Sequence, residues 1–152
     1  MKTIAIYPGS FAPFHIGHLN IAQKSLKMFD EVIIAVGVNP EKNTNKEDVS
    51  ARCIELSKKI NMCVMSFEGL LTDFISRVNQ SRKDCRVVLV RGLRNGNDLD
   101  YEINQLRFME ELSGTKVDVV FIPCDKEFEH ISSSAVRNIS KLSTKLTGKY
   151  II

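Results

Sequence analysis

The 152-residue chain has no long run of apolar residues, and this absence limits where the protein can work. A helix that crosses a membrane needs roughly 18 or more consecutive apolar residues, and no apolar run here approaches that length. The first residues also lack a charged region followed by a secretory apolar region, because Lys2 leads directly into a short strand pattern. We therefore expect no membrane partner and a cytoplasmic location.

Paired cysteines and a strong charge of one sign are also missing. The cysteines show no CxxC spacing and mostly lie in apolar patterns, which predicts buried thiols in preference to metal ligands or disulfides. They are Cys53, Cys63, Cys85 and Cys124. The formal net charge of +3 is spread along the chain, so nucleic acid is not an expected partner. Basic residues near expected loops suit a phosphorylated small molecule better: Lys42, Arg91, Arg94 and Arg137.

What the chain does contain is an alternation of short apolar runs and segments of helical period. Strands are expected at 3–7, 31–38, 62–67, 86–90 and 117–122, with apolar residues at helical spacing between them. The runs 32–36 and 87–90 are apolar without alternation, which is typical of strands covered on both faces. The pattern predicts an α/β fold: a single Rossmann-like domain over residues 1–152, with a five-stranded parallel sheet and helices on both faces.

The most informative segment is Tyr7-Pro8-Gly9-Ser10-Phe11-Ala12-Pro13-Phe14-His15-Ile16-Gly17-His18, which joins the first expected strand to a helix. In a parallel sheet, ligands bind beyond the carboxyl ends of the strands. A helix that begins at Gly17 or His18 would aim its free N–H groups at this loop, which suits an anion. His15 and His18 add hydrogen-bonding side chains. Two histidines at this spacing are often ordinary loop residues, but their position after the first strand favours a phosphate site.

Two further segments follow later strands at the same edge. Arg91 to Glu102 reads RGLRNGNDLDYE, where Arg91 would place a cationic fork at the strand end and the acidic residues would favour the start of a helix. The serines of Ile131 to Ser134 should open another helix, with hydroxyls and backbone donors facing phosphates. The polar segment 39–48 is expected to form a mobile lid over the site.

The spelling of residues 15–18 resembles the HxGH signature of the nucleotidylyltransferase superfamily. With PGSFxPxxxGH, RGLRxxxDxxYE and ISSS in the same order and at the same distances, the chain resembles the bacterial phosphopantetheine adenylyltransferases from Thr3 to about Asn138. The resemblance implies an enzyme of coenzyme A biosynthesis that transfers AMP from ATP to 4′-phosphopantetheine, giving dephospho-coenzyme A and pyrophosphate. It also implies magnesium that arrives with ATP, since no dedicated carboxylate cluster is evident, and a homohexamer.

The resemblance assigns residues to three roles. The catalytic residues would be His18, Lys42 and Arg91. The residues that bind 4′-phosphopantetheine would be Ser10, Lys42, Leu71 and Arg91. The ATP-binding residues would be Ser10, Phe11, His18, Gly92, Leu93, Arg94, Glu102, Phe128, Glu129, His130, Ile131, Ser132, Ser133 and Ser134.

Several positions depart from the family pattern. The family usually has aspartate at Ala12 and threonine at His15, so the bracing of the first loop and the role of His15 stay open. The tail 142–152 does not resemble the usual final helix. Two alternatives also remain. One is an adenylyltransferase for nicotinate or nicotinamide mononucleotide, or a cytidylyltransferase, against which the RGLR-to-YE segment argues. The other is a nucleotide-binding regulatory module without turnover, which Ala12 keeps open.

Overall fold

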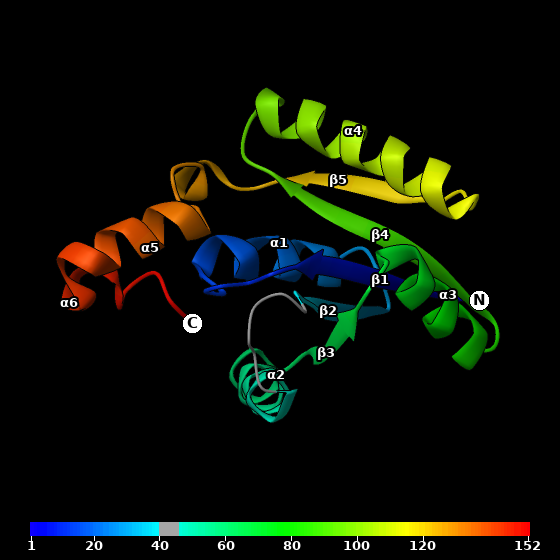
Figure 1. Ribbon diagram of the computed structural model, residues 1–152, viewed down its shortest axis with the longest axis horizontal. Coiled ribbons are helices and arrows are strands. Elements are labelled where there is room, and N and C mark those ends of the chain that lie inside the picture. The colour runs from blue at the N-terminus through cyan, green and yellow to red at the C-terminus, as the bar shows by residue number, and fades with distance from the viewer. Residues whose placement is uncertain (40–45) are drawn as a thin grey trace.

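Five strands form one sheet in which all neighbouring strands are parallel (Figure 1). The computed structural model describes residues 1–39 and 46–152. The strands are β1 (Lys2–Gly9), β2 (Glu31–Val38), β3 (Cys63–Glu68), β4 (Cys85–Leu93) and β5 (Val119–Pro123). Their order across the sheet is β3-β2-β1-β4-β5. The predicted five-stranded parallel sheet is confirmed, and each expected strand is present with its ends moved by a few residues at most.

Helices cover both faces of this sheet, as the continuous apolar runs of β1 and β2 require. Helices α1 (Ile16–Leu26) and α2 (Lys46–Ile60) pack on the face that carries Ala5 and Ile34. Helix α3 (Leu71–Ser81) places Phe74 against the opposite face, where Ile4 and Ile33 are fully buried. The alternating side chains of each strand therefore feed two separate hydrophobic cores.

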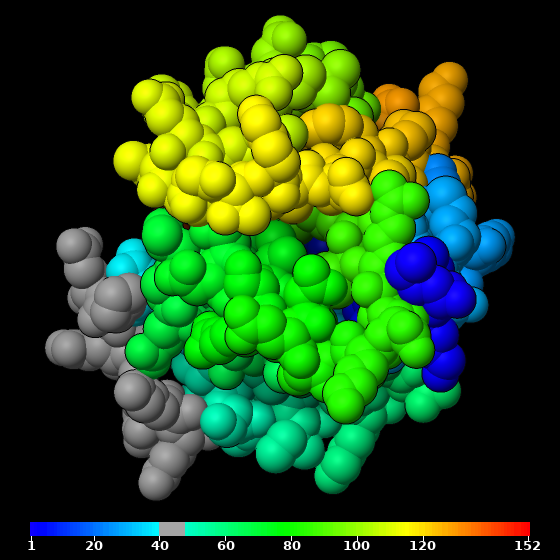
Figure 2. Space-filling view, turned by 90° about the vertical axis from the view of Figure 1, so that its right-hand side faces the viewer, coloured from blue at the N-terminus to red at the C-terminus, as the bar shows by residue number. Residues whose placement is uncertain are grey.

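Helix α4 (Gly96–Ser113) packs more loosely than the others. None of its 18 residues, all of which the structure describes, is buried. A hollow separates α3 from the end of α4 and the connection to β5 (Figure 2), and it is lined by residues such as Ile75, Val87 and Val117. Tyr101, Phe108 and Leu112 of α4 are 62%, 61% and 76% exposed. The helix thus presents apolar side chains that nothing in the described part of the chain covers.

The strand order reverses between β1 and β4, so the loops that follow these strands lie beside each other at the carboxyl edge of the sheet. The remaining elements, η1 (Lys126–Phe128), α5 (Ser133–Leu142) and α6 (Thr144–Thr147), lie beyond this edge (Figure 1). The chain then returns to the first loop. The Ile16 N–H donates to the Tyr150 carbonyl at 2.9 Å, and the Ile152 N–H donates to the Phe14 carbonyl at 3.2 Å.

The cysteines and the helices bear on two expectations from composition. All the cysteines are free thiols; Cys53 is buried, whereas Cys63, Cys85 and Cys124 are only partly buried. The prediction of buried thiols is therefore confirmed for Cys53 alone. Among the described residues, no helix has both the length and the apolar character that crossing a membrane requires.

Candidate active site

The loop after β1 enters α1 through a reciprocal pair of hydrogen bonds between two histidines. His15 Nδ1 accepts from the backbone N–H of Gly17 at 3.1 Å and of His18 at 3.4 Å. In return, His18 Nδ1 accepts from the backbone N–H of His15 at 3.1 Å. This is a capping box built from imidazoles, where a Ser or Thr with a Glu or Gln is more usual. Helix α1 therefore begins at Ile16, slightly earlier than predicted, and His15 has a structural role as its N-cap.

The same contacts define the chemical state of His18. Because its Nδ1 accepts a hydrogen bond, the neutral ring carries its hydrogen on Nε2. The ring stacks on His15 with centroids 3.6 Å apart and meets the Phe11 ring edge to face at 4.9 Å. Burial, followed by the neighbouring His15 and Arg94, lowers the pKa of His18 to about 2. Burial and Arg94 likewise lower the pKa of His15 to about 4. His18 is therefore a neutral donor.

Close packing around α1 depends on two glycines. A Cβ at Gly17 would lie 3.0 Å from the His15 ring, so a side chain there would disturb the cap. A Cβ at Gly92, near the end of β4, would lie 2.9 Å from Cγ1 of Ile21. The glycine in the RGLR motif thus allows α1, which carries His18, to pack closely against β4, which leads into the arginine motif.

Arg91 leaves β4 at its carboxyl end and forms a bidentate ion pair with α4. Its Nε lies 2.6 Å from Glu102 Oε2, and its Nη2 lies 2.8 Å from Glu102 Oε1. Nη1 also donates to the Pro8 carbonyl at 3.3 Å. The two side chains are 27% and 14% exposed. A partly buried fork of this kind is geometrically well defined, so Arg91 is held in one orientation between β1 and α4.

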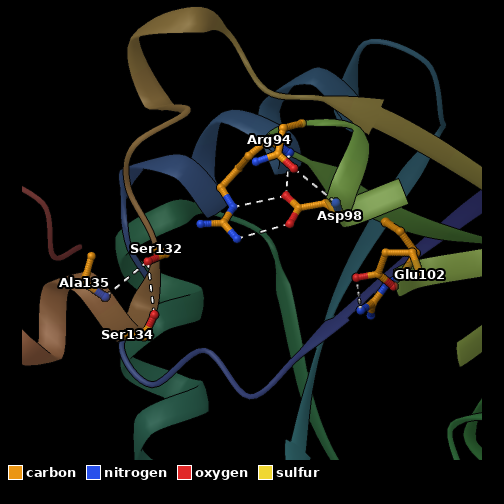
Figure 3. A network of polar contacts seen from close by, with 8 residues as sticks. Arg94, Asp98, Glu102, Ser132, Ser134 and Ala135 are labelled. Atoms are coloured by element: carbon orange, nitrogen blue, oxygen red, sulfur yellow. Dashed lines mark hydrogen bonds and ion pairs between the residues drawn. The ribbon is translucent and has the colours of Figure 1, made fainter. Parts of the chain in front are cut away.

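Arg94 is held in a similar way at the start of α4. Its Nε and Nη2 lie 3.1 and 3.2 Å from the Asp98 carboxylate, and its backbone N–H donates to the same group at 2.8 Å. Asn95 caps the helix by accepting from the Asp98 N–H at 3.1 Å. Figure 3 shows this cluster together with the serines at the start of α5. Asp98 therefore lies in the first turn of α4 and also orients Arg94.

The serine run opens α5 as the sequence predicted. Ser132 is the N-cap, and its Oγ accepts from the Ala135 N–H at 3.1 Å and lies 3.2 Å from Ser134 Oγ (Figure 3). Ser133 Oγ donates to the Pro13 carbonyl at 3.2 Å. The serine motif is thereby tied directly to the first loop.

The bracing of that loop, which the sequence left open at Ala12, comes from a backbone contact. Arg137 Nη1 donates to the Ala12 carbonyl at 2.7 Å. A side chain at position 12 is not needed for this contact, because the acceptor is the main chain. Three motifs that are distant in the sequence therefore meet around one loop.

A cavity of about 260 Å³ lies between these motifs. All residues predicted to bind ATP line it, except Glu129, His130 and Ser134, which are exposed. The cavity also includes Ile21 and Cys124, to which sequence analysis gave no role. The sequence positions of both residues could have predicted this, because Ile21 lies one helical turn after His18 and Cys124 directly follows β5. Lys42 and most of the expected lid segment, 40–45, lie outside the described residues.

A second cavity of about 240 Å³ lies on the other face of the sheet, between α3, α4, β4 and β5. Its lining is mainly apolar and includes Leu71, Leu106 and Met109. Arg91 and Glu102 line this cavity as well as the first one. The bidentate pair therefore stands where a polar cavity and an apolar cavity adjoin, and Leu71 lies in the apolar one.

Carboxylates for a dedicated metal site are few around the first cavity. Within residues 1–39 and 46–152, no three His, Cys, Asp or Glu side chains come together in a way that could hold a metal ion. Asp98 and Glu102 are engaged by Arg94 and Arg91.

Known proteins share this sequence and this fold. Residues 6–139 match the protein family described as cytidylyltransferase-like. The phosphopantetheine adenylyltransferase of Brucella anthropi is 38% identical over 148 residues, covering 92% of this chain and 86% of that protein. The phosphopantetheine adenylyltransferase of Bifidobacterium longum is 33% identical over 151 residues, covering 96% and 86%. In three dimensions, the nicotinic acid mononucleotide adenylyltransferase of Plasmodium falciparum complexed with NaAD has a TM-score of 0.66 over 99% of this chain and 91% of that chain.

The structural neighbour is only 19% identical, so it supports the nucleotidyltransferase fold alone. The sequence relatives carry the assignment further, because both the identity and the coverage are high. The chain belongs to the cytidylyltransferase-like family and, within it, to the family of the phosphopantetheine adenylyltransferases. The resemblance seen in the three sequence motifs is thus confirmed.

Proposed function

We propose that the protein transfers the adenylyl group of ATP to 4′-phosphopantetheine, giving dephospho-coenzyme A and pyrophosphate. The observation that carries the proposal is the pair of adjoining cavities that share Arg91 and Glu102. One cavity offers backbone donors and imidazole, as a nucleotide requires, and the other is apolar enough for the arm of phosphopantetheine. The relatives named phosphopantetheine adenylyltransferase support the same reaction.

The reaction suits a site that positions its substrates and needs no strong base. A phosphate oxygen of 4′-phosphopantetheine attacks the α-phosphorus of ATP, a new P–O bond forms, and the bond to the β-phosphate breaks to release pyrophosphate. The attacking oxygen is already ionised near neutral pH. The protein therefore has to align two anions and stabilise the charge that develops between them.

On the nucleotide side, the N-terminus of α5 is proposed to supply backbone N–H groups to the phosphates. The N–H groups expected from the start of α1 are already used, because those of Gly17 and His18 donate to His15 and that of Ile16 donates to Tyr150. His18 donates from Nε2, the nitrogen that the cap leaves available. Arg94 adds a positive charge beside them. Lys42, outside the described residues, is proposed to reach the reacting phosphates from the lid segment.

On the acceptor side, Arg91 is proposed to bind the phosphate of 4′-phosphopantetheine. A guanidinium has five N–H donors, and its contacts with Glu102 and Pro8 use one on each nitrogen. Among the described residues, donors on both terminal nitrogens remain for a phosphate. Leu71 and its apolar neighbours would then enclose the pantetheine arm. Glu102 orients Arg91, and a contact with the ribose, as expected from the sequence, would be additional to this role.

Three further expectations from the sequence belong to this proposal. Magnesium would enter with ATP, held by phosphate oxygens and water, and would neutralise part of the phosphate charge. A homo-oligomer, a hexamer by family resemblance, is supported by the uncovered apolar side chains of α4. The cytoplasmic location remains a prediction.

Pyrophosphate release from purified protein with ATP and magnesium tests the proposal. Three acceptors are compared: 4′-phosphopantetheine, unphosphorylated pantetheine and nicotinamide mononucleotide. Release with 4′-phosphopantetheine alone is the expected result. Release with nicotinamide mononucleotide would overturn the acceptor assignment and retain the chemistry. If ATP binds and no acceptor gives turnover, the protein is a nucleotide-binding module and not an enzyme.

A further inference from the structure

Three side chains outside the roles assigned so far join α1 to the segment after β5. Asn20 Nδ2 donates to Asp125 Oδ2 at 2.8 Å, and the backbone N–H of Asp125 donates to Asn20 Oδ1 at 2.9 Å. Lys24, one turn along α1, donates to Asp125 Oδ1 at 3.0 Å and also to the carbonyl of Pro123. We call this set of Asn20, Lys24 and Asp125 the clamp.

The side chains of Asn20 and Asp125 both depend on this contact for their hydrogen bonds. Asn20 is 9% exposed, and a buried amide requires partners for its oxygen and its nitrogen; Asp125 supplies both. Asp125 directly precedes η1, where an acidic side chain commonly caps the helix. Here the side chain makes no cap hydrogen bond and turns to α1 instead. Local structure does not account for this orientation, so the contact between the two segments is what holds it.

Each end of the clamp leads directly to a wall of the nucleotide cavity. On α1, His18 lies two residues before Asn20. After Asp125, Phe128 and Ile131 line the same cavity from the segment that follows β5. The Phe128 N–H donates to the Asp125 carbonyl at 3.0 Å, and the Ile131 N–H donates to the Phe128 carbonyl at 3.0 Å. Consecutive main-chain hydrogen bonds therefore link the position of Asp125 to that of the serine motif that begins at Ser132.

We propose that Asn20 and Asp125 are positioning residues that set the separation of the two cavity walls and thereby the affinity for ATP, without contacting ATP themselves. The inference rests on the proposed function for its identification of ATP. It makes a selective prediction, because α1 and the clamp lie on one face of the sheet and the apolar acceptor cavity lies on the other. Loss of the clamp should impair ATP binding and spare the acceptor.

An exchange of the two residue types tests the contact. Asn20→Asp alone would place two carboxylates against each other, and the KM for ATP should rise by about tenfold or more, while the KM for 4′-phosphopantetheine changes less than about twofold. The double variant Asn20→Asp with Asp125→Asn restores both hydrogen bonds with the charge moved to α1, where Lys24 lies at i+4. It should return the KM for ATP to within about threefold of the unchanged protein.

Two other variants complete the design. Asn79→Asp makes the same substitution at an exposed position of α3 and should change neither KM. Asp125→Ala removes the carboxylate from a half-exposed position, so the fold tolerates it even if Asn20→Asp does not fold. An unchanged KM for ATP in Asp125→Ala would by itself overturn the inference. So would a double variant that stays as impaired as Asn20→Asp.

Calorimetric titration of ATP alone keeps this test separate from that of the proposed function. If the unchanged protein shows no turnover with 4′-phosphopantetheine, the proposed function fails, and the dissociation constants for ATP still decide the role of the clamp. If turnover is normal and Asn20→Asp binds ATP as tightly as the unchanged protein, the clamp inference alone is wrong.

Discussion

At the scale of single residues, His18 is prepared to donate a hydrogen bond and not to carry a positive charge in the free site. Its pKa lies at about 2 because the ring is buried among other rings. Its Nδ1 accepts from the backbone N–H of His15, which leaves the hydrogen of the neutral ring on Nε2. A fixed donor of this kind stabilises charge that develops on phosphate oxygens in the transition state.

Replacement of His18 should therefore affect the rate more than binding. We expect His18→Ala to lower kcat by on the order of 10²-fold or more, with a smaller effect on the dissociation constant for ATP. Steady-state kinetics and ATP titration measure the two quantities. His18→Gln can place an amide N–H near the position of Nε2 and should keep more activity than alanine. Normal turnover in His18→Ala would refute the role.

The two buried histidines should also make stability depend on pH. An unfolded histidine has a pKa of about 6.5, whereas burial lowers the pKa of His15 to about 4 and that of His18 to about 2. Below about pH 6.5 the unfolded chain binds more protons than the folded one, so stability is highest above this pH and falls as pH falls.

Urea unfolding between about pH 7 and pH 5 measures this slope. His15→Asn keeps an acceptor for the helix cap and removes one titrating group. The free energy of unfolding should therefore fall less steeply with decreasing pH, with a slope smaller by up to about 1.4 kcal/mol per pH unit. His130→Asn, on the exposed surface, is the matched control. A slope that stays the same in His15→Asn would contradict the proposed linkage.

Arg91 should act mainly on the acceptor substrate. Arg91→Ala is expected to raise the KM for 4′-phosphopantetheine by at least about tenfold, with a smaller change for ATP. Arg91→Lys keeps the charge but cannot form the bidentate pair with Glu102. Its KM for 4′-phosphopantetheine should therefore lie between those of the unchanged protein and Arg91→Ala. Equal losses for both substrates would show that the arginine has been misassigned.

At the scale of secondary-structure elements, α1 packs closely against the end of β4. Gly92 makes this approach possible, because a Cβ there would lie 2.9 Å from Ile21. The returning tail also contributes, since Tyr150 and Ile152 pair with the backbone on either side of His15. Both contacts place α1, and with it the histidine cap, relative to the rest of the molecule.

A methyl group at position 92 should therefore be costly for α1 packing. Gly92→Ala is expected to reduce the free energy of unfolding by about 1–3 kcal/mol, because Ile21 or the helix has to move. Gly96→Ala is the control: a Cβ at Gly96 meets no atom within 4 Å, so the same substitution four residues away should be tolerated. Denaturant unfolding of both variants measures the difference. Equal stability of the two variants would rule out the close approach.

At the scale of the whole molecule, α4 carries apolar side chains that the described part of the chain leaves uncovered. Tyr101, Phe108 and Leu112 are spaced seven and four residues apart, so they lie on one face of the helix. Apolar side chains gathered on an exposed helix face commonly mark an interface between proteins. This face supports the proposed homo-oligomer.

If this face forms the interface of the proposed homo-oligomer, charges introduced on it should separate the subunits. Phe108→Glu combined with Leu112→Glu is expected to shift the sedimentation coefficient to that of a smaller species, because burial of carboxylates in an interface is unfavourable. Arg107→Glu, which lies on the same helix outside the apolar face, should leave the assembly intact. An unchanged assembly in the double variant would place the interface elsewhere.

The sequence by itself determined the class of fold and the segments of the site. Apolar runs such as 32–36, bounded by helical periods, are sufficient for a parallel sheet, because strands buried on both faces have few other solutions. The segments around His18, Arg91 and Ser132 each follow an expected strand, so a parallel sheet was enough to predict that they lie at one edge.

The tertiary structure decided how the individual side chains are used. The capping role of His15, the bidentate pairing of Arg91 with Glu102 and the clamp between Asn20 and Asp125 all depend on atoms brought within about 3 Å across the fold. Hydrogen bonds vary steeply with distance and angle, and sequence spacing does not define these quantities for residues on different elements. The periodicity of a sequence predicts whether a segment forms a helix or a strand. Only the packing of these elements determines which side chains become hydrogen-bond partners.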